Sequence, residues 1–174
     1  MLIIKKNKFK DLLVVQGLSH KDSRGYLREL LLEKSIKKKF KFHIISRSKG
    51  NVLRGLHFQY KKPQGKFVSV LKGKIFDVSV DLRKNSKTFG KSFKITLSEK
   101  NCKSVYIPPG FAHGFQSLEK ENIVCYSCTE YRSIGNEHAL FYNDPFFKIR
   151  WPKKHPIITN KDKNAKKFKY FFKI

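Results

Sequence analysis

The chain has 174 residues, of which 40% are hydrophobic and 14% aromatic, with 16 phenylalanines among them. This composition excludes an intrinsically disordered protein and predicts a single domain over residues 1–174 with an aromatic core. The formal net charge of +26 would favour nucleic acid or an anionic membrane as a partner. The lysines are spread over nearly every segment without a nucleic-acid-binding motif, so we expect neither partner.

Three cysteines bear on the cellular compartment and on metal binding. Cys102, Cys125 and Cys128 cannot all pair, and neither a signal-peptide core nor an apolar run of ~18 residues is recognisable. We therefore expect a reducing, cytoplasmic location. Cys125 and Cys128 have the C-x-x-C spacing of zinc and redox sites, but residues three apart on a strand point to opposite faces. We interpret them as structural thiols and expect no metal.

The N-terminal third predicts short extended segments with little helix. Apolar residues alternate with lysines before Gly17, which predicts an edge strand. A turn at Asp22–Gly25 leads into a predicted strand at Tyr26–Leu32. One helical turn at Lys34–Lys39 precedes another extended segment at Phe40–Ser46.

The middle of the chain predicts a β-hairpin. Lys66–Leu71 and Lys74–Leu82 alternate on either side of Lys72-Gly73. The second arm has an apolar face and a polar face, and the polar face carries Asp77, Ser79 and Asp81. That polar face either lines an internal cavity or faces solvent, and the pattern alone allows both.

The rest of the chain continues in short strands. They are predicted at Lys91–Leu97, Ser104–Ile107, Ile123–Tyr131 and Glu137–Asn143. Short strands separated by turns, without long helices, are typical of an all-β sandwich or barrel. A basic, aromatic C-terminal tail begins at about Lys161, and it is either a terminal helix packed on the barrel or a loose tail.

Two segments place a histidine among apolar residues and glycines. They are Asn51–Gln59, with His57, and Ile107–Phe115, with His113. Half-buried imidazoles are common where proton chemistry takes place, although ordinary core histidines remain the alternative. Arg54, three residues before His57, favours a functional pocket.

Seven sequence motifs occur in order along the chain. They are Asp22-Ser23-Arg24-Gly25, VLRGLHFQ (Val52–Gln59), PQGKFVSV (Pro63–Val70), DVSVDLR (Asp77–Arg83), KTFGKSF (Lys87–Phe93), IPPGFAHGF (Ile107–Phe115), and Asn143-Asp144-Pro145 with Trp151-Pro152. Together they resemble the dTDP-4-dehydrorhamnose 3,5-epimerase family, from about Asp22 to Asp162. The resemblance implies a cupin-type jelly roll, also called a double-stranded β-helix, with minor short helices.

The resemblance also implies a reaction. The family acts as a homodimer, without metal or redox cofactor, on a nucleotide-diphosphate-linked 4-keto-6-deoxy sugar. It converts dTDP-4-dehydro-6-deoxy-glucose to dTDP-4-dehydro-L-rhamnose, a step towards L-rhamnose for surface polysaccharide. Removal of the proton at C3 or C5 gives an enolate of the C4 ketone. Inversion then needs a base on one side of the ring and an acid on the other.

Four residues match the family's catalytic positions. His57 is similar to the general base, and Asp162 to the carboxylate that orients its imidazole. Tyr126 matches the acid, since a phenol with a pKa of about 10 stays protonated until the enolate needs it. Lys66 is expected near the C4 oxygen, where it would stabilise negative charge.

Five further residues are expected to bind the substrate. Arg24 and Arg54 are the expected diphosphate ligands, and Glu29, His113 and Tyr131 complete the set. On a regular strand Arg54 would face away from His57. The sequence therefore predicts either a bulge between them or a strand that begins after Arg54.

The nucleobase is left open by departures from the family pattern. A gapless count places Phe42 and Ile44 where the family often has a glutamine and an asparagine that read the base. Leu27 stands where an aromatic residue is expected. Because polar contacts usually supply base discrimination, thymine, uracil and guanine all remain candidates.

Alternative functions also remain open. The same residues suit a single epimerisation at C3 or C5, or a 3,4-ketoisomerase. A non-catalytic sugar-nucleotide-binding cupin and a basic nucleic-acid-binding barrel are further alternatives. His57 and His113 would suit a metal-binding cupin, but the first motif lacks the H-x-H pair and following glutamate that such a site needs.

Overall fold

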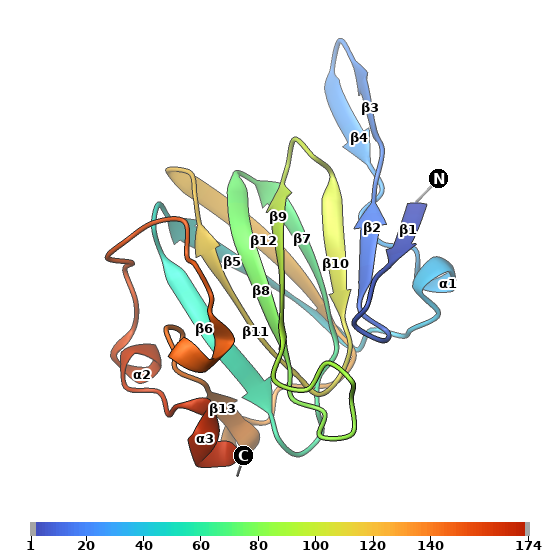
Figure 1. Cartoon of the computed structure of the whole chain (residues 1–174). Helices are drawn as coiled ribbons and strands as arrows, with labels where there is room; N and C mark the ends of the chain where they lie inside the picture. The colour runs from blue at the N-terminus through green and yellow to red at the C-terminus, as the bar shows by residue number, and fades with distance from the viewer. Residues whose placement is uncertain (1–2, 173–174) are drawn as a thin grey trace.

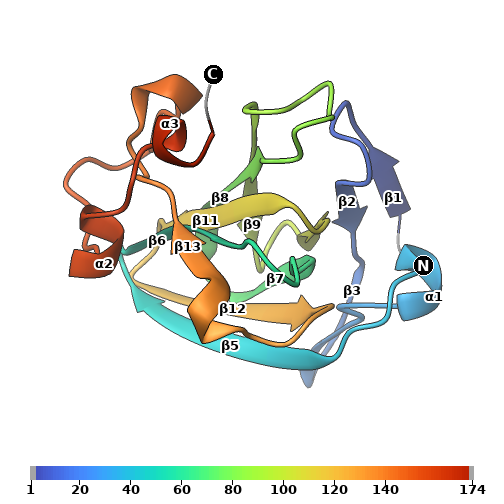
Figure 2. The same ribbon diagram turned by 90° about the horizontal axis from the view of Figure 1, so that it is seen from below.

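Two antiparallel sheets pack face to face in the computed structural model, which describes residues 3–172 (Figures 1 and 2). The first sheet has the spatial order β1 (Ile3–Lys6), β2 (Leu13–Gln16), β10 (Lys103–Ile107), β7 (Lys66–Lys72), β12 (Glu121–Cys128) and β5 (Phe42–Lys49). The second has the order β13 (Glu137–Ala139), β6 (Leu53–Gln59), β11 (Phe111–Ser117), β8 (Lys74–Asp81) and β9 (Ser92–Ser98). The all-β prediction is confirmed.

The predicted hairpin of β7 and β8 is wrong, although both strands exist. Strand β7 pairs with β10 and β12, whereas β8 pairs with β9 and β11. The link at Gly73, whose φ is +81°, therefore carries the chain from one sheet to the other. Alternation identified the strands, but it could not identify their partners, because a tight turn serves a hairpin and a sheet-to-sheet crossing equally well.

The main core lies between the two sheets. Val68 and Val105 of the first sheet and Ile75 and Phe115 of the second belong to one buried cluster, together with Phe9. Full burial of such side chains is worth ~1.5–3 kcal/mol each, so this cluster is a main source of stability.

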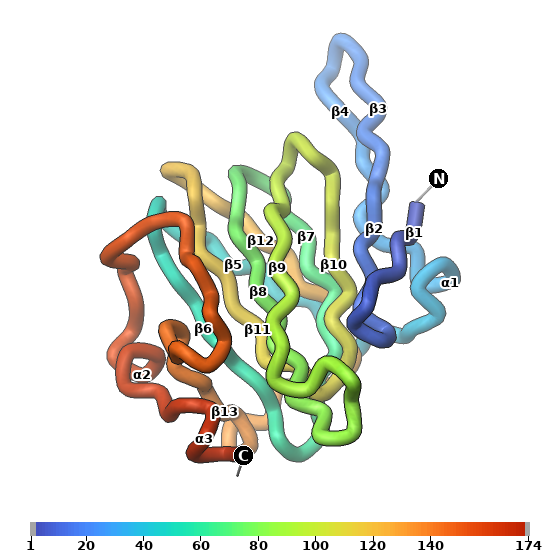
Figure 3. The backbone as a smooth tube through the Cα atoms, viewed as in Figure 1, coloured from blue at the N-terminus to red at the C-terminus, as the bar shows by residue number. Residues whose placement is uncertain are grey.

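The N-terminal segments differ in part from expectation. Residues before Gly17 form two strands, of which β1 is the sheet edge and β2 lies between β1 and β10. The next strands, β3 (Ser19–Asp22) and β4 (Gly25–Arg28), form a hairpin that projects from the barrel (Figure 3). Strand β4 therefore ends well before Leu32. Helix α1 (Glu33–Ile36) supplies the predicted helical turn.

The C-terminal segment packs on the outer face of the second sheet, so the loose-tail interpretation is wrong. It contains two single-turn helices, α2 (Asn160–Lys163) and α3 (Phe168–Phe171), and follows the short helices η1 (Ile134–Asn136) and η2 (Pro145–Phe147). Phe168, which is 0% exposed, packs in a cluster with Val78 and Val80 of β8. The apolar face of β8 thus binds the C-terminal segment.

The polar face of β8 points into the barrel, so the solvent-facing interpretation is also wrong. Asp77, Ser79 and Asp81 are each 0% exposed. Asp81 binds Arg83, Ser86 and Thr88 and orders the loop before β9. Burial raises the pKa of Asp81, but these hydrogen bonds outweigh it and hold the pKa below its usual value.

All three cysteines are free. Burial raises the pKa of Cys128 to about 11 and also raises that of Cys125, so both side chains are neutral thiols at neutral pH. Within residues 3–172, no helix is long and apolar enough to span a membrane.

Replacing Phe168 by alanine tests the packing of the C-terminal segment. The ring is fully buried against Phe89, Phe146 and Phe172, so we expect Phe168→Ala to lower the free energy of unfolding by ~3–5 kcal/mol. Tyr170 of the same helix is 69% exposed, and Tyr170→Ala should cost within ~0.5 kcal/mol. Urea denaturation measures both, and equal effects would contradict this packing.

Candidate active site

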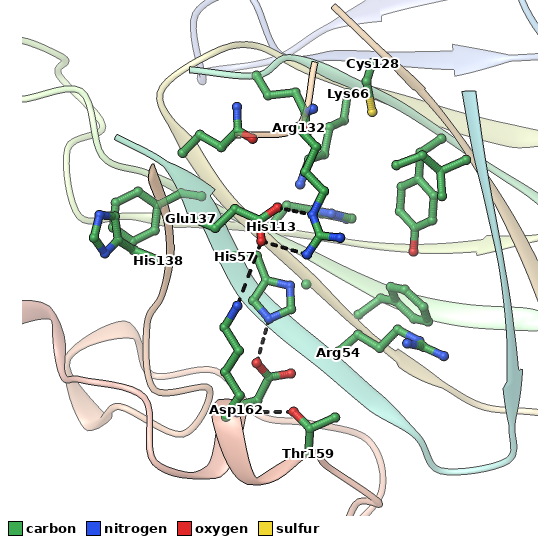
Figure 4. Close-up of a pocket in the computed structure, with 18 of the residues that line it drawn as sticks. Arg54, His57, Lys66, His113, Cys128, Arg132, Glu137, His138, Thr159 and Asp162 are labelled. Carbon is green, nitrogen blue, oxygen red and sulfur yellow. Dashed lines mark hydrogen bonds and ion pairs between the residues drawn. The ribbon is translucent and has the colours of Figure 1, made fainter. Parts of the chain in front are cut away.

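A cavity of about 440 Å³ opens where the polar side chains of the barrel meet. Its wall includes side chains from β5, β6, β7, β11, β12, β13 and α2, as Figure 4 shows in part. Its lining residues include Phe42, Ile44, Arg54, His57, Lys66, His113, Tyr126, Arg132, Glu137 and Asp162. A volume of this size suits a small organic ligand.

A bulge in β6 turns Arg54 and His57 towards the same cavity. His57 lies opposite His113 and Arg54 lies opposite Phe115, so three steps along β6 match two steps along β11. The extra residue restores both side chains to one face. Gly55 takes a φ of +119° there. Of the two predicted solutions, the bulge is confirmed.

His57 is held by a carboxylate from the far end of the chain. Its Nε2 lies 2.6 Å from Oδ1 of Asp162 (Figure 4). An ionised carboxylate only accepts hydrogen bonds, so Nε2 carries the proton and Nδ1 keeps a free lone pair. The imidazole is 41% exposed, whereas the Asp162 side chain is 4% exposed. A fixed tautomer facing the cavity is what a general base requires.

Asp162 is itself fixed by α2. The Thr159 hydroxyl caps this helix by accepting from the Asp162 N–H at 3.2 Å, and the Gly55 N–H donates to Oδ2 at 3.3 Å. Burial raises the pKa of Asp162, but the hydrogen bond and charge of His57, with the Gly55 N–H, outweigh it and hold the pKa below its usual value. The carboxylate therefore stays ionised beside the imidazole.

A second histidine and carboxylate lie deeper in the barrel. Nε2 of His113 lies 2.7 Å from Oδ2 of Asp77, and the two side chains are 5% and 0% exposed. The other carboxylate oxygen of Asp77 is buried without a hydrogen-bond partner among the described residues. His57 and His113 thus each bind a carboxylate. Among residues 3–172, no group of three or more His, Cys, Asp or Glu side chains is arranged to hold a metal ion.

Tyr126 and Lys66 supply the other polar groups of the wall. Burial raises the pKa of Tyr126, although its hydrogen bond with the Ser46 hydroxyl at 3.2 Å opposes the shift, so the phenol stays protonated. Its ring lies edge-on to His113 at 6.1 Å. Burial lowers the pKa of the Lys66 ammonium. A desolvated cation of this kind is best satisfied by negative charge on a ligand.

The remaining predicted residues are divided between the cavity and the surface. Arg54 lines the cavity, with Nε donating to the Ser48 hydroxyl at 3.0 Å. Tyr131 is not among the lining residues, but its ring stacks on that of Phe42 with centroids 5.7 Å apart. Arg24 and Glu29 do not reach the cavity of their own chain. The Arg24 side chain is 88% exposed at the tip of the β3–β4 hairpin, and Glu29 is exposed just after it.

Sequence reasoning missed three charged residues at the cavity mouth. Glu137 binds Arg132 through both oxygens, at 2.6 and 3.0 Å, and Lys161 lies 3.9 Å from it. Arg132 and Glu137 are five positions apart and form a local pair that no motif marked, whereas only the fold brings Lys161 to them. Asp77 was also missed as a site residue, although its place on an inward polar face was a usable signal.

Comparison with known proteins identifies the family of this chain. A family model described as dTDP-4-dehydrorhamnose 3,5-epimerase matches residues 6–170. The chain belongs to the dTDP-4-dehydrorhamnose 3,5-epimerase family. A relative of that name from Methanothermobacter thermautotrophicus is 42% identical over 162 residues, which cover 88% of each chain. The predicted family and the predicted isomerase class are confirmed.

Solved structures agree with this family. The chain is 36% identical to a dTDP-6-deoxy-D-glucose-3,5-epimerase from Legionella pneumophila, crystallised with dTDP-4-keto-L-rhamnose, with a TM-score of 0.91 and coverage of 96% and 93%. A 3'-monoepimerase from Streptomyces bikiniensis, in complex with dTDP-quinovose, is 25% identical, with a TM-score of 0.86 and coverage of 91% and 84%. The cupin-type jelly roll is confirmed.

Replacing Gly55 by alanine tests the bulge in β6. An alanine Cβ would lie 2.6 Å from the Gly114 Cα and 2.7 Å from the His113 carbonyl oxygen, at a φ that L-residues rarely adopt. We expect Gly55→Ala to cost at least ~1–3 kcal/mol of unfolding free energy and to lower turnover. Gly135→Ala, which meets nothing within 4 Å, is the control. Wild-type stability of Gly55→Ala in urea would contradict this geometry.

Proposed function

We propose that this chain epimerises C3 and C5 of dTDP-4-dehydro-6-deoxy-glucose and releases dTDP-4-dehydro-L-rhamnose. One observation carries the proposal: an imidazole held by a buried carboxylate shares a cavity with a buried, protonated phenol. That combination suits removal of a proton next to a ketone and return of a proton from another direction. It serves no purpose in a protein that only binds its ligand.

The first step is proton abstraction by His57. Its Nδ1 takes the proton from C3 or C5, and the imidazolium that forms is stabilised by Asp162 at 2.6 Å. Electrons from the broken C–H bond move into the C3–C4 or C4–C5 bond and place negative charge on O4. The ammonium of Lys66 is the cavity cation suited to neutralise that charge.

The second step is return of a proton from the opposite face of the ring. Tyr126 donates its phenolic proton to the carbon, and the C4 ketone forms again. Because burial keeps the phenol protonated in the free enzyme, the acid is available in every turnover. The phenolate then recovers its proton, and the imidazolium loses one to solvent, so the reaction has no net proton change.

We also propose a homodimer in which the β3–β4 hairpin reaches the partner's cavity. The hairpin projects from its own barrel (Figure 1), and its side chains Tyr26 and Leu27 are 55% and 68% exposed. It also carries Arg24, while Glu29 follows it, and neither of these two expected substrate ligands lines the cavity of its own chain. A second copy would bury these apolar side chains and would place Arg24 and Glu29 beside the substrate in its own cavity.

The product is a precursor of activated L-rhamnose for polysaccharide, and we place the reaction in the cytoplasm. The three free thiols are compatible with a reducing compartment. Arg54, at the cavity wall, remains the proposed ligand of the diphosphate.

Epimerisation at a single carbon is the second candidate. Its support is the structural similarity to the 3'-monoepimerase. In deuterated water, double epimerisation labels C3 and C5, whereas the second candidate labels one of them. Proton NMR of the product separates the two.

Variants of His57 and Tyr126 separate the two proposed steps. We expect His57→Asn to lower turnover by ~10²–10⁴-fold and to abolish deuterium exchange, since no base remains. Tyr126→Phe should preserve exchange better than net inversion, because the enolate still forms. His155→Asn, at an exposed residue outside the cavity wall, is the control. Exchange by His57→Asn, or parallel loss of exchange and inversion by Tyr126→Phe, would refute the assigned roles.

Mixing two inactive variants tests the shared site. If the hairpin serves the partner, a mixed dimer of Arg24→Ala and His57→Asn chains has one intact site. Random exchange should then restore about a quarter of the wild-type sites, because half of the dimers are mixed. In self-contained sites each chain carries its own defect, so mixing would restore nothing. A monomeric mass in solution would also refute the proposal.

A further inference from the structure

One wall of the cavity is apolar although the chain is strongly basic. On β5, Phe42 and Ile44 face the cavity, opposite Cys128 and Tyr126 of β12. The next residue on that face, Ser46, is already bound to the Tyr126 hydroxyl. Strand β5 therefore offers a ligand two hydrocarbon side chains in a row.

An aromatic pair extends this wall to the surface. The rings of Phe42 and Tyr131 are stacked, with centroids 5.7 Å apart and planes 25° apart. Lys41 lies over the Tyr131 ring at 5.5 Å and binds Glu130 at 2.7 Å. We call these three side chains, Phe42, Ile44 and Tyr131, the apolar platform. The platform remains accessible, with Ile44 40% and Tyr131 59% exposed. Contiguous exposed apolar side chains beside a pocket are typical of a ligand-binding surface.

The opposite part of the cavity has the opposite chemistry. His57, Asp162 and Glu137 lie there, with Arg132 and Lys161 bound to Glu137. The cavity therefore suits a ligand with a polar, hydroxylated part and a flat, less polar part. A sugar nucleotide has both, and its reacting sugar belongs beside His57. The base of the nucleotide would then pack against the apolar platform.

Hydrocarbon side chains cannot recognise the hydrogen-bonding edge of a base, because they have neither donor nor acceptor. They can hold its ring face and its methyl group. Loss of one methylene-sized group from a ligand in an apolar pocket changes selectivity by only about 10- to 200-fold. A buried hydrogen-bonding side chain that loses its partner on the ligand changes selectivity by roughly 10⁴-fold or more.

We propose that Phe42 and Ile44 hold the nucleobase by its ring and methyl group, and that Tyr131 is a positioning residue that orients Phe42. The enzyme then selects bases by size and methylation, and it tolerates a change in their hydrogen-bonding edge. This inference rests on the proposed function, since it assumes that the ligand is a sugar nucleotide.

Binding of three nucleoside diphosphates to the full-length protein tests the proposal by calorimetry. dUDP and dCDP have the same size and lack the methyl group, and they differ in their hydrogen-bonding edges. We expect their dissociation constants to agree within ~3-fold, and dTDP to bind roughly 10-fold more tightly because of its methyl group. A difference of ~10-fold or more between dUDP and dCDP would overturn the proposal, because it would require polar readers of the base edge.

Variants of the platform locate the contact. Phe42→Ala should weaken all three nucleotides equally, by about 5- to 150-fold, the usual worth of stacking on an aromatic ring. Tyr131→Ala should weaken them less, and Tyr131→Phe should restore binding, since only the ring supports Phe42. Ile45→Ala, on the outward face of β5 and 64% exposed, is the control and should change nothing. Unchanged binding by Phe42→Ala would overturn the proposal.

The wild-type comparison needs neither a variant nor turnover, so it remains decisive if Phe42→Ala fails to fold. A protein that binds the three nucleotides in the expected order but gives no deuterium exchange at C3 or C5 would refute the epimerase and leave the platform standing. Normal exchange with strong discrimination between dUDP and dCDP would refute the platform alone.

Discussion

The contact between His57 and Asp162 is the interaction on which the site depends. The two residues are 105 positions apart, and the hydrogen bond between them is 2.6 Å long. A strand at the barrel mouth provides the imidazole, and a single-turn helix of the C-terminal segment provides the carboxylate. Neither element is functional alone, so the proposed chemistry requires that the last part of the chain fold back over the outer face of the second sheet.

Strand β8 explains how both sides of that sheet are used. Val78 and Val80 point outwards and bind the segment that contains Phe168, while Asp77 points inwards and binds His113. The period of two residues in a strand therefore places a hydrophobic layer behind the sheet and a polar network in front of it. One stretch of sequence thus supports the position of Asp162 and that of His113 simultaneously.

Sequence reasoning found the class of fold and several residues of the cavity wall, but it failed where distant segments meet. Alternation located β7 and β8, yet their pairing was wrong, because pattern does not record which sheet a strand joins. The motifs led to His57 and Asp162 through a family resemblance. Without it, Asp162 is one carboxylate among many lysines. Glu137 and Arg132 are only five positions apart, but no motif marked them, because the cavity that they line is assembled by tertiary structure.

The outer layer behind the second sheet makes loss of catalysis and loss of the barrel separable events. The cluster between the sheets does not include Phe168 or α2. If the C-terminal segment detaches while the sheets stay paired, the imidazole loses its carboxylate and the protein keeps its architecture. Mild heat or denaturant would then abolish turnover before the barrel unfolds. Cooling or removal of denaturant would restore turnover without refolding of the barrel.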